Sequence, residues 1–547
     1  IYLNWRLWIY GIAFLMLGFI FAKLWRRAGV LTDAELTNAR YSGKGVTLLR
    51  GFKAIYYGTV FNCMVLAMVL VAAGRIAEVF LPWHLWLPAN IYSALSSITE
   101  FLGFTLGQSL TGLDPLIYNT NITISILILV SFTLFYSTTG GLRAVVATDV
   151  VQFALAMTGT LLFAIFVWVE ADVSVNFAQR LNEVYSSHQT AEFLSFSPPE
   201  GSLFWPFIVL VSVQWFFQIN SDGTGYLAQR MMACKSNRDA RIASLIFAWS
   251  QVFFRSILWI VIGVGLLLIY PFNQADLAAP GFVAWRESTY IQGIQDFLPM
   301  GVKGLMLVGM LGALASTIDT HLNWGASYWS NDLYKHILCE KIIKRQVSNR
   351  EIVWVARLSN IFILLIGLVI MTHLGSIQTA WTITLLFGSG MGSVLVMRWL
   401  WERVNLFSEV AAMAVSLVAA TSLILWGDSI AEYVQVVLVG FLSTAAVIVT
   451  TLLTQPTSPE KLKEFFLKVQ PKGFWGKTAL ACGVDPAVSR RELWFGIQNT
   501  ALAALTLFLC VVGVASLIVQ NPNQPMIFAA LEVFVGLAIA PLWYRHI

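Results

Sequence analysis

The chain has 547 residues, of which 58% are hydrophobic and only 12% are charged, and its formal net charge is +5. Soluble globular domains carry about 25% charged residues. The charges are therefore too few to cover a water-facing surface, which excludes an ordinary soluble protein and indicates an integral membrane protein.

Apolar segments long enough for a membrane-spanning helix, which takes about 20 residues, follow one another along the chain. They lie at 6–25, 53–80, 119–137, 144–169, 203–229, 242–270, 302–334, 354–373, 377–400, 409–426, 430–453, 493–519 and 525–544. Turn residues at 373–376 and 520–525 divide two long uncharged runs into hairpins. The sequence predicts an all-α integral membrane protein with about 13 transmembrane helices.

Basic residues distinguish the two ends of these helices. With thirteen crossings, all but six of the 34 Lys and Arg residues fall on one side of the membrane; the six are Arg6, Arg75, Arg180, Arg255, Arg286 and Lys303. Lys and Arg gather in cytoplasmic loops. We therefore expect a multi-pass protein of the plasma (inner) membrane, with the N-terminus of this chain outside and its C-terminus in the cytoplasm.

Three connections between the predicted helices are long. The outside loop 81–118 contains no Lys or Arg, and we expect it to include an interfacial helix. The outside loop 170–202 is acidic. The inside loop 454–492 is polar and basic, but it is too short for a kinase or nucleotide-binding domain.

Known enzyme motifs are missing from the sequence. The five cysteines have no CxxC spacing, and no HExxH, P-loop or GxSxG pattern occurs. We expect a protein that is not an enzyme. Its expected partners are a small-molecule solute and the lipid bilayer, with no nucleic acid and no obligate protein partner.

Candidate functional charges within the predicted spans are Asp149, Asp222, Arg255 and Asp319. A charge in a membrane span costs about 2.5–3.5 kcal/mol on insertion scales, so it marks a transport pathway by default. Arg75 and Glu78 lie nearer the outer surface, where a helix-end position or a structural ion pair is the simpler interpretation.

Small and oxygen-bearing side chains recur on one face of the segment 311–334. The pattern of i, i+3 and i+4 spacing, as on one side of a helix, includes Ala313, Ser316, Thr317, Thr320 and Asn323. Sodium is a hard cation that takes oxygen ligands. A stripe of small residues also serves close helix packing in membranes, so the spacing alone leaves both interpretations open.

Four motifs together resemble those of the sodium:solute symporter family, relatives of the sodium/glucose cotransporters. The motifs are Gly140 to Gln152 (GGLRAVVATDVVQ), Ala313 to Tyr334, Tyr226 to Arg230 followed by Ala233 to Ser236, and Arg398 to Asn405. They stand in the order in which the family has them.

The resemblance implies the LeuT-type fold, in which two inverted five-helix repeats enclose a site at mid-membrane. Residues 1–405 would form the symporter core, from the second to the tenth core helix. The family's first core helix has no counterpart here, and we expect a sequence shortened by one or two helices rather than a protein without the family mechanism. Residues 406–547 would add four C-terminal transmembrane helices with a cytoplasmic loop at 454–492.

The resemblance also implies ion sites. One sodium site would include Ala313, Ser316 and Thr317. A second would use Asp149, Asp319 and Thr320, so that one or two Na+ ions bind. Relatives with this second site have hydroxyls where this chain has Asp319, which makes proton coupling possible.

The solute site should lie where the sixth core helix breaks. Polar residues at this break are Gln214, Gln218, Asn220, Ser221 and Asp222; further candidates are Gln251, Arg255, Gln378, Trp381 and Thr384. For each of them a plain packing role is the alternative. Arg255 could bind a solute carboxylate or neutralise Asp222, so the choice between a sugar and an organic acid stays open.

These inferences converge on one expected function. The protein would be a sodium-coupled secondary active symporter that imports a small polar organic solute, a sugar or small organic acid, by alternating access. The alternative is a symporter-like membrane sensor without transport.

Overall fold

The computed structural model describes residues 8, 10–103, 109, 112–172, 176–198, 201, 204–279, 281–374, 377–427, 429–545 and 547. The side chains at 102, 138–144, 210, 283–284 and 377–379 lie outside this description. Over the described residues the regular structure is helical, apart from one isolated β-bridge between Trp401 and Phe474. The predicted all-α class is confirmed.

The helices follow in chain order. The first half contains α2 (Tyr10–Met16), the π-helix η2 (Leu17–Phe21), α3 (Ala22–Ala28), α4 (Asp33–Arg40), α5 (Val46–Ile55), the π-helix η3 (Tyr56–Phe61), α6 (Asn62–Phe80), α7 (Trp83–Trp86), α8 (Ala89–Leu102), α9 (Pro115–Glu170), α10 (Phe177–Val184), α11 (Ser187–Leu194), α12 (Phe204–Ser212), α13 (Gln214–Phe217), α14 (Tyr226–Ala233), α15 (Asn237–Trp249), the π-helix η4 (Ser250–Phe254) and α16 (Arg255–Ile269). The second half contains the 3₁₀-helix η5 (Asp276–Ala278), α17 (Phe282–Phe297), α18 (Met300–Ser327), the π-helix η6 (Tyr328–Ile343), α19 (Asn349–His373), α20 (Ile377–Ser389), α21 (Gly392–Leu400), α22 (Leu406–Trp426), α23 (Glu432–Leu453), α24 (Pro459–Val469), α25 (Gly476–Ala481), α26 (Pro486–Val519) and α27 (Met526–Tyr544).

Eleven helices in the described part of the chain are long and apolar enough to cross a membrane. The other two expected spans are interrupted. The span at 6–25 consists of α2, η2 and α3, and the span at 203–229 is broken into α12, α13 and α14. A multi-pass membrane protein is confirmed, and the exact number of crossings stays a prediction.

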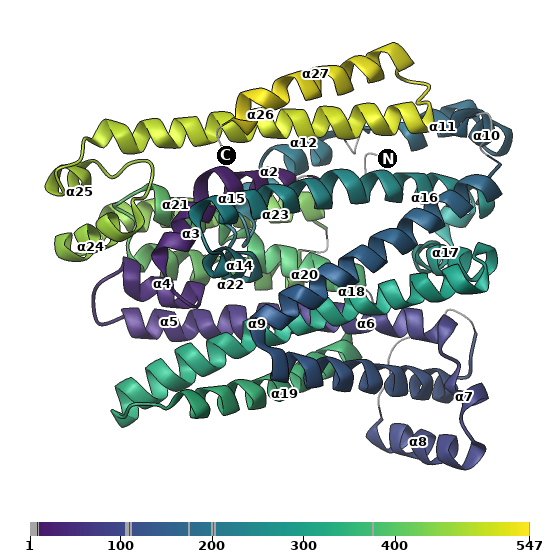
Figure 1. The fold of residues 1–547 in the computed structure, drawn as a ribbon, viewed down its shortest axis with the longest axis horizontal. Coiled ribbons are helices and arrows are strands. Elements are labelled where there is room, and N and C mark those ends of the chain that lie inside the picture. Colours follow the sequence, from purple (N-terminus) through teal and green to yellow (C-terminus); the bar gives the residue numbers. More distant parts are fainter. Residues whose placement is uncertain are drawn as a thin grey trace.

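The long helices run across Figure 1, and some of the short helices lie at its two ends. α4, α24 and α25 lie at the left end, which we call the basic end because it contains the basic segment 454–492. α10, α11 and α17 lie at the opposite end. Segments that the sequence places on opposite sides of the membrane are thus at opposite ends of the molecule.

Helix α9 contains two apolar spans, Pro115–Ser137 and Val145–Glu170. The helical backbone continues through Gly140–Gly141, and the two spans diverge from a corner near the label of α9 in Figure 1. The chain therefore reverses by a bend within α9 rather than by a loop.

Helices α9 and α18 pack along a seam of small residues. A Cβ atom on Gly309 would lie 2.9 Å from Cα of Ala156, and one on Gly312 would lie 3.2 Å from Cγ of Gln152. These distances leave no room for a larger side chain. The second span of α9 is thereby held directly against the face of α18 that carries Ser316 and Thr320.

The broken span of α12 to α14 meets a second interruption, which lies in the span at 377–400. Residues 218–225 separate α13 from α14, and Gly223 and Gly225 have φ of 86° and 98°, the left-handed region that favours glycine. The other span is interrupted between α20 and α21. A Cβ atom on Gly392, the first residue of α21, would lie 2.2 Å from the carbonyl oxygen of Phe216.

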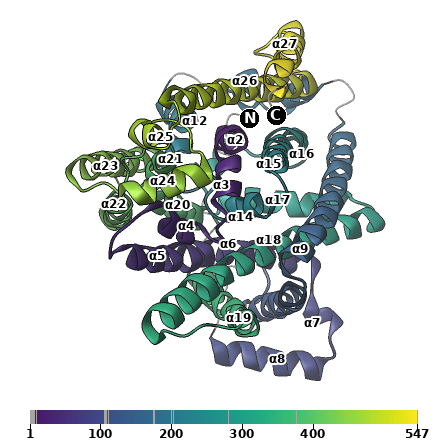
Figure 2. The same ribbon diagram turned by 60° about the vertical axis from the view of Figure 1, so that its left-hand side comes forward.

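The C-terminal helices pack onto the preceding ones. α22 and α23 form a pair that contacts α20, and α26 and α27 form a hairpin whose first helix contacts α2 and α16. Figure 2 shows this hairpin on the side of the molecule opposite to α8. A functional boundary at residue 405 stays a prediction, since the structure joins both parts closely.

The segment 454–492 is docked on the basic end. Trp475 donates from Nε1 to the carbonyl oxygen of Trp399 at 2.8 Å, and its ring lies 4.8 Å from the Arg40 guanidinium. The Glu402 carboxylate accepts hydrogen bonds from the backbone N–H groups of Lys477 and Thr478. This segment therefore covers the end of α21.

Candidate functional site

The expected ion-site residues gather between α9, α14 and α18. Asp149 on α9 accepts a hydrogen bond from Ser316 Oγ of α18 at 2.6 Å through its Oδ1. Its Oδ2 lies 3.2 Å from Nη2 of Arg230 on α14. The same nitrogen donates to Thr320 Oγ1 at 2.8 Å. Three of the expected residues are thus linked, and Arg230 completes the group.

Asp319 has a different environment one helical turn along α18. Its side chain is buried, and Oδ1 accepts a hydrogen bond from Asn323 Nδ2 at 2.6 Å. Asn323 also donates to Ser137 Oγ of α9 at 3.0 Å. The second carboxylate oxygen of Asp319, Oδ2, is buried and has no hydrogen-bond partner among the residues that the structure describes. A buried carboxylate oxygen without a partner is costly unless a proton or a cation satisfies it.

Ala313 and Thr317 lie on the neighbouring side of α18. Thr317 donates from Oγ1 to the Ala313 carbonyl oxygen at 2.9 Å, and the hydroxyl of Tyr136 donates to the Ala315 carbonyl oxygen at 3.2 Å. Of the three residues expected at the first sodium site, Ser316 therefore contacts Asp149, while Ala313 and Thr317 bond to each other.

The donors present fit a hard monovalent cation. Carboxylate and hydroxyl oxygens come from Asp149, Ser316, Asp319 and Thr320, and such a cation prefers oxygen ligands. Among the residues that the structure describes, no group of three or more His, Cys, Asp or Glu side chains is placed to hold a metal ion. The arrangement suits an ion held partly by hydroxyls.

Asp222 is part of a buried ion pair with Arg398. Its Oδ2 accepts from Arg398 Nη2 and from Trp399 Nε1, each at 2.8 Å, and its Oδ1 accepts from the backbone and hydroxyl of Thr224. Both oxygens are therefore engaged within the protein. The expected alternative in which Arg255 neutralises Asp222 is wrong, because Arg398 holds that position.

Arg398 belongs to a larger buried group of charges at the basic end. Its Nη1 lies 3.3 Å from Glu409 Oε1, and Glu409 Oε2 lies 2.9 Å from Nζ of Lys53. The Tyr41 hydroxyl donates to Glu409 at 3.0 Å. Each charge has an opposite partner, which offsets the cost of removing it from water. The group joins α5, α21 and α22 to the break before α14.

Arg255 lies apart from these ion pairs. Its guanidinium lies 4.2 Å from the centre of the Trp259 ring, a cation–π contact, and its Nε is buried without a hydrogen-bond partner. It is close enough to Tyr226, the first residue of α14, for an electrostatic interaction. Arg255 therefore faces the region just after the break.

The other expected solute residues divide into two sets. Ser221 donates to the Gly392 carbonyl oxygen at 3.0 Å, Gln218 is buried, and Thr384 donates to the Ala380 carbonyl oxygen at 2.8 Å. Gln214, Asn220, Gln251 and Trp381 are half-buried. The side chain of Gln378 lies outside the described residues. Ser221 and Thr384 thus bond within the protein, whereas the buried Gln218 Nε2 has no hydrogen-bond partner among the residues that the structure describes.

Sequence reasoning missed four charged residues of these groups, namely Arg230, Arg398, Glu409 and Lys53. Arg230 and Arg398 stand within two of the motifs that carry the family resemblance. The count of basic residues places Arg230 and Arg398 on the basic side of the membrane, but such a count does not show which residues turn inward. Their position in a motif was the available signal.

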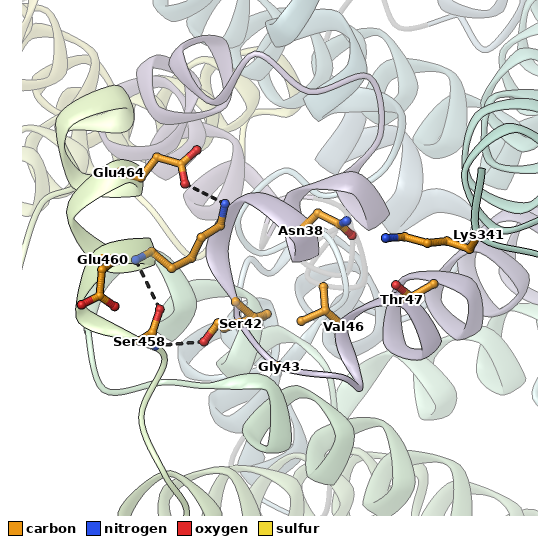
Figure 3. Close-up of a pocket in the computed structure, with 11 residues that line it drawn as sticks. Asn38, Ser42, Gly43, Val46, Thr47, Lys341, Ser458, Glu460 and Glu464 are labelled. Carbon is orange, nitrogen blue, oxygen red and sulfur yellow. Dashed lines mark hydrogen bonds and ion pairs between the residues drawn. The ribbon is translucent and has the colours of Figure 1, made fainter. Parts of the chain in front are cut away.

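A hollow of about 450 Å³ lies on the basic end (Figure 3), and its lining does not include Asp149, Asp319 or Arg255. It is lined by residues of α4, α5 and α24 and by Lys341. Ser458 N donates to Ser42 Oγ at 2.9 Å, and Lys461 pairs with Glu464 at 2.9 Å. Lysines and glutamates alternate around the hollow, so it presents no single charge, and it marks where the segment 454–492 meets α4 and α5.

Comparisons with known proteins all indicate the same family. The profile of the Sodium:solute symporter family matches residues 93–419. The high-affinity proline transporter PutP of Bacillus subtilis is 27% identical over 377 residues, covering 66% of this chain and 71% of the transporter. Sodium/glucose cotransporter 1 of Oryctolagus cuniculus is 21% identical over 430 residues, covering 73% and 57%. The chain spans about half the length of several curated relatives that it matches.

The fold is that of a solved transporter. A structure described as a substrate-bound outward-open state of a Na+-coupled sialic acid symporter matches with a TM-score of 0.59 and 16% identity, covering 82% of this chain and 84% of the other. This confirms the expected LeuT-type fold. The family consists of transporters rather than enzymes. With a family profile that matches more than half of its residues, the chain belongs to the sodium:solute symporter family.

Proposed function

We propose that the protein is a sodium-coupled secondary active symporter that imports a small polar organic solute by alternating access. The observation that carries this proposal is the oxygen cluster of Asp149, Ser316, Asp319 and Thr320 beside the broken span of α12 to α14. In LeuT-type transporters the coupling ion and the solute bind next to such breaks. The relatives named as a sodium/glucose cotransporter and a proline transporter support the same activity.

The charges of the cluster favour one monovalent cation. The cluster contains two carboxylates and one guanidinium, and that guanidinium, Arg230, pairs with Asp149, so an ionised Asp319 would leave one uncompensated negative charge. A sodium ion at the free Oδ2 of Asp319 would supply the missing positive charge. A proton on Asp319 would do the same, so sodium and proton would compete for this oxygen. A second sodium at Ala313, Ser316 and Thr317 is part of the proposal.

A solute with a carboxylate fits the region after the break better than a neutral sugar. Arg255 has a buried Nε without a hydrogen-bond partner and faces Tyr226 at the start of α14. A guanidinium binds a carboxylate through paired hydrogen bonds. Gln214, Asn220 and Gln251 would supply further polar contacts, and Gln378, Trp381 and Thr384 would contribute from α20.

The proposed orientation follows from the basic end. The protein would lie in the plasma (inner) membrane with the basic end in the cytoplasm, which places the C-terminus of this chain inside and its N-terminus outside. The solute and the bilayer would be its partners, without an obligate protein partner.

Uptake by the full-length protein in proteoliposomes tests the proposal. An inward sodium gradient should drive accumulation of a labelled solute from a panel of proline, sialic acid, glucose and small carboxylates, and a potassium gradient should not. Equal accumulation of the solute with a sodium and with a potassium gradient would contradict the proposal. Solute-induced thermal stabilisation without any accumulation would instead favour a membrane sensor.

A further inference from the structure

Arg230 connects the broken span to the ion cluster. It lies on α14, five residues after Gly225 ends the break, and its side chain reaches both α9 and α18. Nη2 lies 3.2 Å from Asp149 Oδ2 and donates to Thr320 Oγ1 at 2.8 Å, while Nη1 donates to the Tyr226 carbonyl oxygen at 3.4 Å. The guanidinium thus occupies the space between two of the oxygens expected to bind an ion.

A guanidinium and a sodium ion cannot hold the same carboxylate oxygen equally well. Arginine does not lose its proton in proteins, so Arg230 always presents a positive charge to Asp149. An ion that binds to Asp149 and Thr320 has to displace Nη2 from both oxygens. Ion binding at these oxygens and the contact of α14 with α9 and α18 therefore exclude each other.

The exposure of this pair distinguishes it from the structural ion pairs of the molecule. The side chains of Arg230 and Asp149 are 24% and 21% exposed. Those of Arg398 and Asp222 are 1% and 0% exposed, and both members of the Lys53–Glu409 pair are equally buried. The Arg230–Asp149 pair is thus partly exposed, whereas the other two pairs are fully buried.

We propose that Arg230 is a tethered cation that competes with sodium for Asp149, so that ion binding there releases α14 from α9 and α18. This inference rests on the proposed sodium symport. It makes Arg230 a positioning residue, because it acts on the solute region through α14. Since α14 follows the break directly, its release couples the ion cluster to the segment that would contact the solute.

Removal of the Arg230 charge should strengthen sodium binding. Arg230→Gln should lower the half-saturating sodium concentration about tenfold, the low end expected for a charge-assisted hydrogen bond in a partly exposed pair. The readouts are sodium-induced thermal stabilisation of the purified protein and sodium-dependent uptake. Arg230→Lys keeps the positive charge and should stay close to the wild-type value. Arg238→Gln removes an exposed basic residue from the same end of the molecule and should change nothing.

A second substitution separates competition from a structural role. Asp149→Asn removes the carboxylate for which Arg230 and sodium would compete, so Arg230→Gln should no longer lower the half-saturating sodium concentration when it is made in the Asp149→Asn background. An unchanged or higher half-saturating sodium concentration in Arg230→Gln would overturn the inference. If wild-type protein shows neither a sodium response nor sodium-driven uptake, the proposed symport itself fails. A sodium response of the wild-type protein that Arg230→Gln leaves unchanged would overturn only the inference about Arg230.

Discussion

Arg398 Nη2 lies 2.8 Å from Asp222 Oδ2, and both side chains are almost completely buried. The pair fixes the break before α14 to the end of α21, so an acidic residue expected to contact the solute is instead part of the scaffold. Removing one partner of a buried pair leaves the other charge unpaired.

We expect Arg398→Gln to lower the free energy of unfolding by about 3–5 kcal/mol, the usual cost of breaking a buried pair. Asp222 would lose its charged partner, and Glu409 would keep its pair with Lys53 but lose the one with Arg398. Chemical denaturation in detergent measures the change. Arg350→Gln, at an exposed position, is the control and should stay within about 0.5 kcal/mol of wild type. Equal stability of the two variants would contradict a structural role for the pair.

Arg255 and Asp222 should act independently. Because Asp222 is paired with Arg398 and Arg255 stacks on Trp259, the effects of Arg255→Gln and Asp222→Asn on stability should add within about 0.5 kcal/mol. Arg255→Gln alone should cost about 1 kcal/mol of stability, the scale of a cation–π contact. A double-mutant cycle by denaturation provides the measurement. A double variant more stable than Asp222→Asn would show coupling and refute this assignment.

Arg255 also has a predicted effect on solute choice. If it binds a carboxylate, Arg255→Gln should weaken the affinity for an acidic solute by about 1.5–3 kcal/mol. Competition binding with a labelled acid and its neutral amide measures this. Equal loss for the acid and the amide would mean that Arg255 does not contact the carboxylate.

The seam between α9 and α18 should not tolerate added volume. Gly309→Ala places a Cβ atom 2.9 Å from Cα of Ala156, so we expect a loss of about 1–3 kcal/mol in stability. Gly304→Ala on the same helix adds a Cβ atom with no neighbour within 4 Å and is the matched control. The thermal unfolding temperatures of the two variants test this expected loss of stability. A Gly309→Ala protein as stable as the control would contradict the close packing.

Ser316 should contribute to sodium affinity through Asp149. Ser316→Ala removes the hydroxyl that donates to Asp149 and would supply an ion ligand, so half-saturating sodium should rise about threefold to tenfold. Adding Thr317→Ala should raise it further. Thr158→Ala removes an exposed hydroxyl on α9 and is the control. Wild-type sodium dependence in the Ser316, Thr317 double variant would leave the stripe a packing feature.

Local patterns predicted the parts of the structure that depend on neighbouring residues. Apolar length identified the spans, and the glycines at 223 and 225 marked the break. The motifs indicated Asp149 and Ser316 as ion ligands in two separate sites, and a direct hydrogen bond in the structure links the two residues. Each of these features has a signature within a few residues of the chain.

The ion pairs could not be predicted in the same way. Arg398 and Asp222 are 176 residues apart, and Lys53 and Glu409 are 356 residues apart. No periodicity links such positions, and counting basic residues by side assigns Lys53 and Arg398 to water. Only the folded arrangement shows that these charges turn inward and find partners.

The docking of the segment 454–492 has a consequence for how the protein is made. Trp475, which covers Trp399, is synthesised 76 residues later, after α22 and α23 have also left the ribosome. Until then the Arg40 guanidinium and the Trp399 backbone lack the ring that contacts them in the finished protein. The basic end therefore closes late in biosynthesis, and a nascent chain that stops after α23 exposes this surface to membrane-insertion factors and proteases.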